Sequence, residues 1–470
     1  MSMRKLPEII QGGMGVNISS PELAKMVSKL GQQGTVSGTA LEWLMVRSLQ
    51  MGDPGEHFRR VLAGFPFQSM VKEIMEKFYV KGGIPKNTPF KGIPHIGFHP
   101  SHLFIALVIC ANFAVVRMAK EGHDNPISIN YLEKIALPHV HALYGAIMGG
   151  VDIITMGAGI PLQIPGLISD IVEGNECSYS VPVSGTNIKS SAIKFNPVEF
   201  FGEIPKNLKK PKFIPIISSN LLANLFLKRS PEGSVDGFVV EEPTAGGHNA
   251  PPRRVDPGAA PDAPPVYGEK DRVDYHEMAK LGIPFWIGGS NASPEKLRHA
   301  RSVGATGIQA GTIFALAEES GMVPELRAKL RKSGYDGELN IRTDSRISPT
   351  GFPFKLAEVD GSIAESTVYD GRVRICNKGL LVTPYEKEGE RIGYRCSAEP
   401  EEKFIQKGGN PDEVAGRGCL CNGLLATAGV GDEVEPPIVT LGDDLGFLRK
   451  LMKHNAGSYS AKDAINYLLS

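Results

Sequence analysis

The residues best suited to chemistry lie in Gly237–Pro252, which reads GFVVEEPTAGGHNAPP. A short apolar run of β type, Phe238–Val240, ends in two acids, and a glycine pair further on is followed directly by His248. Glycine lets a backbone approach a flat or anionic ligand closely because it has no Cβ, and histidine exchanges protons near neutral pH. The segment therefore predicts a strand-end loop that holds a ligand and offers it one acid–base group.

A second chemically interesting group is made of four of the six cysteines, which fall in one region of the chain: Cys376, Cys396, Cys419 and Cys421. Four thiolates that lie close together suit zinc or an iron–sulfur cluster. Their spacing, C-x19-C-x22-C-x-C, matches no standard signature of such sites. Two interpretations stay open: a metal site formed by these four residues, or unrelated buried thiols.

The strand-end loop must be positioned by a larger framework, and short apolar runs recur along the chain. Each run is followed by a glycine-bearing loop and a helical segment: Glu8–Gln11, Gly34–Ser37, Pro126–Asn130, Val151–Met156, Phe213–Ile217, Gly237–Val240, Pro284–Ile287 and Thr306–Gln309. Apolar strands separated by helices indicate a parallel sheet covered on both faces. Eight such units predict an α/β fold, the closed (β/α)8 or TIM barrel, in which the strand-end loops share one face. A doubly wound open sheet is the alternative, but its glycine fingerprint is missing.

Three segments exceed a minimal barrel. We expect residues 1–336 to form the barrel, with a helical insertion at about residues 41–100 and a lid over the site at about residues 249–274, a stretch rich in proline and charge. Residues 337–470 are turn-rich, carry the four cysteines and are predicted to form a C-terminal extension packed against the barrel. Within the barrel, helices are predicted at Ser20–Leu30, Leu132–Met148 and Pro294–Val303, and the apolar run Leu103–Val116 is predicted to be a buried helix.

Small residues follow five of the predicted strands: Gly12–Gly15, Ser37–Thr39, Ala245–His248, Gly288–Ser290 and Ala310–Thr312. Backbone N–H groups at such positions bind phosphate well, and in barrels the loops after strands seven and eight frequently do so. Here those two loops read IGGSNASPE and IQAGTIFA. One such loop is typical of an ordinary turn, whereas five on one barrel face favour a phosphorylated planar cofactor.

The order of five motifs, IIQGGMG, PISINYLEKI, EEPTAGGH, WIGGSNASPEK and ATGIQAGTIFALAEESG, resembles the nitronate monooxygenase (2-nitropropane dioxygenase) family over roughly Glu8–Gly321. The segments INYLEKI and LYGAIMGGVDIITMGAGIPLQIPG, with the long tail, resemble the branch that contains trans-acting enoyl reductases of polyunsaturated fatty acid and polyketide synthases. The resemblance implies a TIM barrel that binds FMN.

The resemblance also implies roles for individual residues. His248 matches the active-site histidine, which is expected to bind a substrate oxygen or to move a proton. Residues implied to hold FMN are Gly12, Gly13, Met14, Asn130, Ala245, Gly246, Gly247, Gly288, Gly289, Gln309, Ala310, Gly311 and Thr312. After His248 the family usually has another small residue, but this chain has Asn249-Ala250-Pro251-Pro252, which leaves the substrate geometry open.

The expected function is therefore an FMN-dependent oxidoreductase that oxidises a nitronate-like small substrate with dioxygen. The alternatives are an NAD(P)H-dependent enoyl-thioester reductase, with NAD(P)H or an acyl carrier as partner, and a flavin-binding assembly subunit. Lys+Arg and Asp+Glu both number 51, so neither nucleic acid nor an anionic membrane is an expected partner. With no secretory signal in Met1–Pro7, we expect a cytoplasmic enzyme, for which a homodimer is the candidate assembly.

Overall fold

The computed structural model describes residues 6–185, 190–254, 258, 260, 263–388, 391–432, 435–452 and 457–470. Eight parallel strands form one sheet in the order β1-β10-β9-β8-β7-β4-β3-β2. Their bounds are β1 Ile9–Gln11, β2 Gly34–Ser37, β3 Ile127–Leu132, β4 Ile153–Gly157, β7 Lys212–Ile217, β8 Phe238–Glu241, β9 Phe285–Gly288 and β10 Gly307–Ala310. Each of the eight predicted strands is confirmed to within two residues.

The sheet closes on itself between its first and last strands. Ile10 forms a parallel bridge with Gln33, immediately before β2. The Gln11 N–H donates to Gln33 O at 2.9 Å, and the Gln33 N–H donates to Ile9 O at 3.0 Å. This closure makes the sheet a barrel, so the predicted (β/α)8 fold is confirmed and the open doubly wound sheet is not adopted.

The interior of the barrel is filled by its own strands. Ile10, Ile153, Ile214, Val239 and Trp286 pack together there, each at most 8% exposed. Bulky apolar side chains from alternate strands fill the inside of such barrels and make it a packed core rather than a channel. The ligand-binding space must therefore lie beyond the strand ends.

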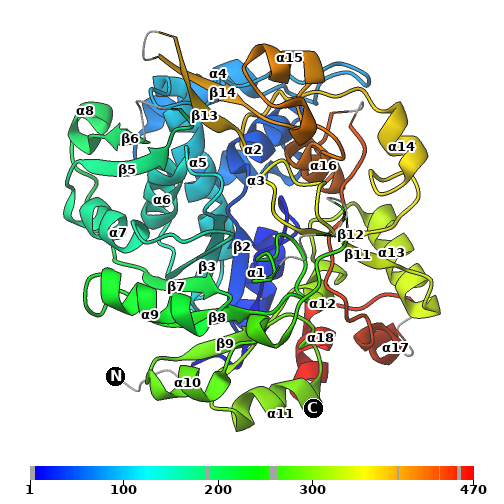
Figure 1. Ribbon diagram of the computed structural model, residues 1–470. Coiled ribbons are helices and arrows are strands. Elements are labelled where there is room, and N and C mark those ends of the chain that lie inside the picture. Colours follow the sequence, from blue (N-terminus) through cyan, green and yellow to red (C-terminus); the bar gives the residue numbers. More distant parts are fainter. Residues whose placement is uncertain are drawn as a thin grey trace.

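Helices surround the barrel (Figure 1). After the barrel strands they are α1 Pro21–Lys29, α5 His102–Ala119, α6 His139–Met148, α7 Ile164–Glu173, α9 Asn220–Arg229, α10 Tyr275–Lys280, α11 Pro294–Ser302 and α12 Thr312–Ala315. Ser20 caps α1 by accepting from the Leu23 N–H at 3.1 Å, with Pro21 as the first helical residue. Such caps satisfy an N–H that the helix itself leaves unpaired.

Helix α6 corrects one prediction. The helix expected from Leu132 begins only at His139, because Leu132 is the last residue of β3 and Pro138 precedes the helix. A residue before proline is disfavoured in helical conformation, so the helix could not extend back through this point. By contrast, the apolar run Leu103–Val116 is confirmed as a buried helix: α5 has the length and composition of a membrane span, but most of it is buried inside the protein.

Additional elements fall into three groups. The predicted insertion is helical and consists of α2 Leu41–Gln50, η1 Pro54–Glu56, α3 His57–Leu62 and α4 Gln68–Phe78. An unpredicted hairpin and helix precede β7: β5 Cys177–Pro182, β6 Ser190–Phe195 and α8 Pro197–Phe201. A short turn, η2 Glu269–Asp271, lies in the proline-rich segment.

The chain after residue 323 forms further short helices and two antiparallel strand pairs. Its elements are α13 Pro324–Asp336, β11 Ile341–Asp344, β12 Phe354–Ala357, α14 Ser366–Gly371, β13 Thr383–Lys387, β14 Arg391–Arg395, α15 Glu401–Gln406, η3 Pro411–Glu413, α16 Leu420–Thr427, α17 Phe447–Leu451 and α18 Ala461–Leu468. The last of these, α18, packs against α1, α11 and α12. Because α1 and α11 follow β1 and β9, α18 takes the outer position beside β10, where the eighth barrel helix would lie.

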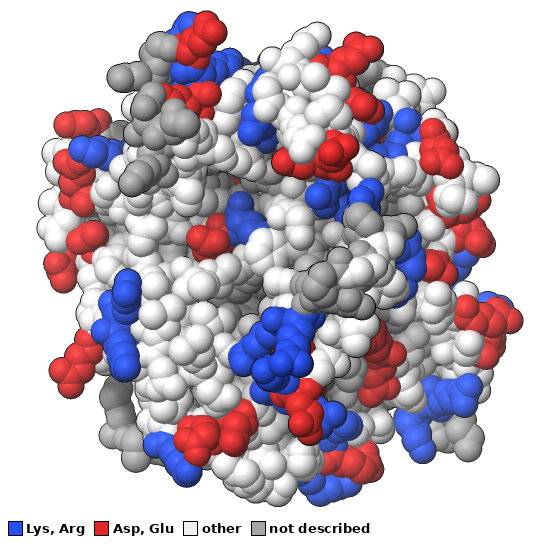
Figure 2. Space-filling model, viewed as in Figure 1, with Lys and Arg blue, Asp and Glu red and all other residues white. Residues whose placement is uncertain are grey.

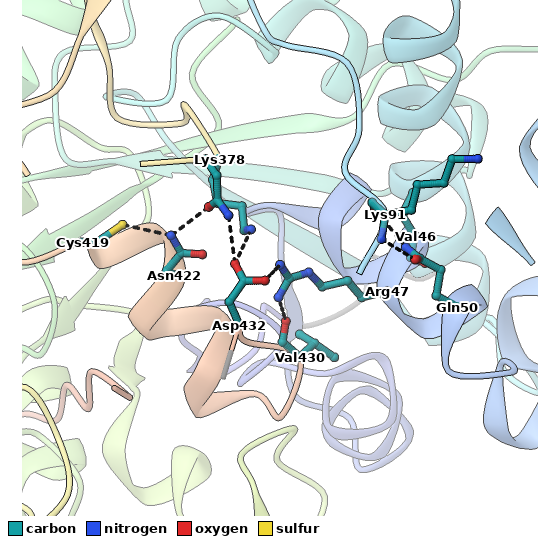
Figure 3. A network of polar contacts seen from close by, with 10 residues as sticks. Val46, Arg47, Gln50, Lys91, Lys378, Cys419, Asn422, Val430 and Asp432 are labelled. Atoms are coloured by element: carbon teal, nitrogen blue, oxygen red, sulfur yellow. Dashed lines mark hydrogen bonds and ion pairs between the residues drawn. The ribbon is translucent and has the colours of Figure 1, made fainter. Parts of the chain in front are cut away.

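A buried ionic network joins the insertion to the extension (Figure 3). Asp432 accepts from Arg47 Nη2 and from Lys378 Nζ, both at 2.7 Å, and the side chains of the two cations are each 2% exposed. Arg47 also donates to Val430 O, and Asn377 donates to Asp432 at 3.1 Å. Burial alone would raise the pKa of Asp432, but Lys378 and Arg47 outweigh it and hold that pKa below its ordinary value.

The Asp432→Asn substitution is expected to destabilise the protein by about 3–5 kcal/mol, because it leaves two buried cations without a counter-charge. Urea or thermal unfolding measures the effect. Breaking the exposed Lys72–Glu76 pair with Glu76→Gln is the matched control, for which little change is expected. An Asp432→Asn protein as stable as the Glu76→Gln control would contradict this account of the network.

Candidate active site

One large cavity lies at the carboxyl ends of the barrel strands. All fourteen residues predicted for the active site and FMN line it: Gly12, Gly13, Met14, Asn130, Ala245, Gly246, Gly247, His248, Gly288, Gly289, Gln309, Ala310, Gly311 and Thr312. Strand-end loops of a parallel barrel meet on one face, which is why Gly12 and Thr312, 300 positions apart in the sequence, converge. The individual roles predicted for these residues stay predictions.

The loop after β1 lies tightly against the end of β3. A Cβ added at Gly13 would stand 2.2 Å from Asn130 Cβ, so only glycine fits there. Thr155 Oγ1 donates to Asn130 Oδ1 at 2.9 Å, which fixes the orientation of the amide. The Met14 N–H donates to Ser19 Oγ at 3.0 Å and closes the loop. This side of the cavity is therefore a close-packed backbone surface.

The loops after β9 and β10 offer polar groups to the cavity. Ser290, which has φ of 47°, carries a buried hydroxyl that has no hydrogen-bond partner among the described residues. Thr312 Oγ1 accepts from the Gly442 N–H at 2.8 Å, and a hydroxyl that accepts one bond can still donate another. An unsatisfied buried hydroxyl costs free energy unless a ligand pairs with it, so this end of the cavity is suited to an anionic, oxygen-rich group.

The loop that carries Ala245–His248 is held by the C-terminal extension. The Lys355 N–H donates to Gly247 O at 2.9 Å, and the Gly247 N–H donates to Thr440 Oγ1 at 2.7 Å. The Asn249 N–H donates to Pro353 O at 2.9 Å, and His248 forms an antiparallel bridge with Phe354. The extension therefore pairs with this loop as a further strand would, and it fixes the backbone on both sides of His248.

His248 is neutral in this environment. Burial, and next the positive charge of Lys134, lower the pKa of His248 to about 3. Its Nε2 shares a hydrogen bond of 2.7 Å with Ser348 Oγ, and its ring stands edge-on to Phe354 with centroids 5.0 Å apart. Neither Ser348 nor Phe354 was predicted, because both belong to the extension and no sequence spacing connects them with His248.

Two charged residues beside His248 were also missed as site residues. Glu241, the last residue of β8, lines the cavity, and burial raises its pKa to about 7 against the opposing charge of Lys134. Lys134 follows β3, and burial lowers its pKa to about 8 although Glu133 and Glu241 oppose this. The sequence did carry a signal for Glu241, since it is one of the two acids that end the apolar run.

The extension also supplies an apolar wall. Five leucines line the cavity beside Cys421: Leu380, Leu381, Leu420, Leu424 and Leu441. Figure 2 shows both uncharged residues and several charged side chains around the central hollow of this face. Apolar walls with a few convergent polar groups are typical of small-molecule sites. The predicted extension thus forms part of the site, which its turn-rich sequence did not indicate.

The proline-rich segment lies beside this cavity. Of its described residues at positions 249–274, none lines the main cavity; several line a smaller adjoining one together with Glu241: Asn249, Ala250, Pro251, Arg253, Tyr267 and Asp271. Residues 255–257, 259, 261 and 262 lie outside the described residues. The leucines of the extension line the main cavity, and the lid role expected for the proline-rich segment stays a prediction.

The four cysteines gather but form no preformed metal site. Cys376 and Cys396 share a hydrogen bond, and the charge of Cys376 also acts on Cys419 and Cys421. Burial raises the pKa of Cys419 to about 12, and Asn422 Nδ2 donates to its sulfur at 3.3 Å. Across the described ranges, no three His, Cys, Asp or Glu side chains are arranged to hold a metal. Zinc or iron–sulfur binding by these residues therefore stays a prediction without support from their geometry.

The contact between loop and extension can be tested at Gly246. A Cβ there would stand 3.0 Å from the Leu441 carbonyl carbon and 3.1 Å from the Gly442 nitrogen. Because both neighbours are backbone atoms, we expect Gly246→Ala to displace residues 440–444 and to speed their amide hydrogen exchange. Gly268→Ala, where a Cβ meets no described atom within 4 Å, is the control. Unchanged exchange in the Gly246→Ala protein would contradict the close approach.

No protein-family model matches this sequence, and no curated protein matches it significantly. Solved structures with a similar course of the chain include FabK from Thermotoga maritima, with 14% identity, a TM-score of 0.48 and coverage of 98% of this chain and 91% of that one. The enoyl reductase domain of MlnA from the macrolactin biosynthesis cluster of Bacillus amyloliquefaciens has 12% identity and a TM-score of 0.49, with 98% and 93% covered. Nitroalkane oxidase from Streptomyces ansochromogenes has 11% identity and a TM-score of 0.45, with 98% and 94% covered. Similarity at this level describes the course of the chain alone.

Proposed function

We propose that this protein is an FMN-dependent oxidoreductase. The observation that carries the proposal is the cavity itself, in which close-packed glycine loops, the Ser290 hydroxyl and an apolar wall meet at the strand ends. That buried hydroxyl has no partner in the part of the chain that the structure describes. A flat ring needs backbone surfaces without side chains, and a phosphate needs donors at one end. The family resemblance of the motifs points to the same cofactor.

The residues present fit FMN. Gly12, Gly13 and Met14, with Asn130 and the Ala245–Gly247 loop, would hold the ring system. Ser290 and Thr312, with the backbone of Gly288, Gly289 and Gly311, would hold the phosphate. The Gln309 side chain lies against both Gly12 and Gly288, and Ala310 lies against Gly12. FMN, when bound, would supply the electron-transfer chemistry that amino-acid side chains lack.

His248 serves as a neutral hydrogen-bonding group in this proposal. With a pKa of about 3, the ring carries no extra proton at neutral pH, so it is suited to bind a substrate oxygen rather than to donate a proton. Ser348 engages Nε2, which leaves Nδ1 as the ring nitrogen that no hydrogen bond within the described chain uses.

The apolar wall helps to decide which substrate the site suits. A small nitronate is an anion that needs a compact polar site. The five leucines instead offer a surface for an aliphatic chain, and burial of such a chain is favourable by about 25 cal/mol per Å2 of apolar area. This observation favours reduction of an enoyl thioester, with NAD(P)H as reductant, over oxidation of a nitronate with dioxygen. A flavin-binding assembly subunit would need no such wall.

The visible absorption spectrum and anaerobic mixing test these alternatives. We expect the purified protein to be yellow, its flavin to be bleached by NAD(P)H, and the colour to return on addition of a medium-chain enoyl thioester. Bleaching by a nitronate alone would favour the nitronate monooxygenase reaction instead. Flavin that reacts with neither would favour the assembly subunit, and a colourless protein that takes up no flavin would overturn the proposal.

Retention of the cofactor can be tested at Gly13. Gly13→Ala places a methyl group where Asn130 Cβ already stands, so we expect loss of bound flavin, measured by absorbance after gel filtration. Gly166→Ala, in α7 with nothing within 4 Å of the added Cβ, is the control and is expected to keep its flavin. Full flavin content in a folded Gly13→Ala protein would contradict the proposed ring site.

The role of His248 is tested with His248→Ala and His248→Gln. We expect the alanine variant to lose about 100-fold in the rate of thioester reduction, as is typical when one donor to a substrate oxygen is removed, and glutamine to restore part of it. Because the pKa of His248 is about 3, the pH profile between 5 and 8 should keep its shape in both variants. An alanine variant within twofold of wild type would contradict the assignment.

A further inference from the structure

The two acids that end β8 lie in different environments. Glu242 accepts a hydrogen bond from the Tyr275 hydroxyl and belongs to the smaller cavity only. Glu241 lines both the main and the smaller cavity, and no hydrogen bond to its carboxyl is found within the described residues. Glu241 is therefore the acid whose carboxyl remains available to a ligand, with the smaller cavity behind it.

Lys134 is fixed near Glu241. Its Nζ donates to Ala158 O at 2.9 Å and lies 3.5 Å from the centroid of the Phe352 ring. The charges of Lys134 and Glu241 act on each other, and Lys134 also acts on His248. The cation, which follows β3, thus acts on both acid–base groups of the cavity, although β7 and β4 lie between β3 and β8 in the sheet.

The titratable and charged side chains around Glu241 come from three parts of the chain. Lys134 and Glu133 follow β3, and Glu242 and His248 belong to the loop after β8. The proline-rich segment contributes Arg253, Tyr267 and Asp271 through the smaller cavity. Among these, Lys134 is the charge that lowers the pKa of Glu241, while burial raises it to about 7. The balance leaves both protonation states of Glu241 populated near neutral pH, which suits a general acid.

Reduction of an enoyl thioester needs a proton at the α-carbon, and neutral His248 is a poor source. We propose that Glu241 is the catalytic residue that delivers this proton and that Lys134 is a positioning residue that sets its charge. This inference rests on the proposed enoyl-thioester reduction and names the acid of that reaction. The smaller cavity, lined by polar residues of the proline-rich segment, gives the carboxyl a second side from which water can reprotonate it.

The β-carbon gains a hydride whose two electrons come ultimately from the reduced nicotinamide dinucleotide, and the C=C double bond opens. The α-carbon gains the proton of the Glu241 carboxyl, leaving a carboxylate and a saturated thioester. Water restores the proton to Glu241, and the nicotinamide leaves oxidised.

Glu241→Gln and its neighbour Glu242→Gln form a matched pair. In D2O the wild type should place deuterium on one face of the α-carbon, as read by NMR of the product. We expect Glu241→Gln to slow reduction by about 100-fold or more and to lose this facial preference, while Glu242→Gln keeps both rate and preference. A Glu241→Gln enzyme within twofold of wild type and with the same preference overturns the proposal.

A second measurement needs no turnover. Infrared difference spectra of the wild type minus Glu241→Gln report the protonated carboxyl of Glu241 as pH is varied. We expect half-titration near pH 7 in the wild type and a shift to higher pH in Lys134→Met, because removal of a nearby cation disfavours the carboxylate. A Glu241 carboxyl that is fully ionised at pH 6, or that does not respond to Lys134→Met, overturns the proposed roles.

The two proposals fail separately. If the wild type reduces no enoyl thioester, the proposed function is wrong. Glu241 then has no reaction in which to donate a proton, whatever the infrared titration reports. If the wild type reduces enoyl thioesters and Glu241→Gln does so equally well, the function stands and Glu241 is not the donor.

Discussion

The site depends on one interaction, the backbone pairing between the loop of Ala245–His248 and the extension. A strand-end loop of a barrel has backbone groups that its own sheet does not pair, and unpaired buried groups are costly. Residues 353–355 and Thr440 supply those partners. The same pairing brings Ser348 to His248 and sets the leucine wall over the cavity. Without it, the barrel would present a glycine loop to solvent instead of a shaped, largely apolar site.

The extension must in turn be held in position, and its contact with the helical insertion does this. Arg47 of α2 and Lys378 of the extension share Asp432, so charges from both parts are buried together. Such a pair adds little net stability compared with an apolar contact, but it strongly disfavours any arrangement that leaves a charge alone. The insertion and the extension therefore specify each other's position.

The sequence allowed the barrel and its glycine loops to be predicted because both are local patterns. Apolar runs followed by small residues located every barrel strand and the glycine loops, and the family resemblance added individual positions such as Asn130 and Gln309. The extension escaped because its contribution is non-local: Ser348 and Thr440 have no periodicity that connects them with a loop some 100 to 200 residues earlier. Glu241 was visible as one of two acids, but only the fold separates it from Glu242. The cysteines clustered in sequence and in space, yet clustering does not create ligand geometry.

The position of α18 has a consequence for how the protein is made. This helix, residues 461–468, fills the gap in the outer ring beside the first and eighth strands. During synthesis, α1 and β10 leave the ribosome long before their shared neighbour exists. The apolar surface of α1, α11 and α12 that α18 later covers therefore stays exposed while more than 140 further residues are translated. A chaperone that recognises exposed apolar surface would bind the nascent protein here, beside β1 and β10, the first and last strands of the barrel.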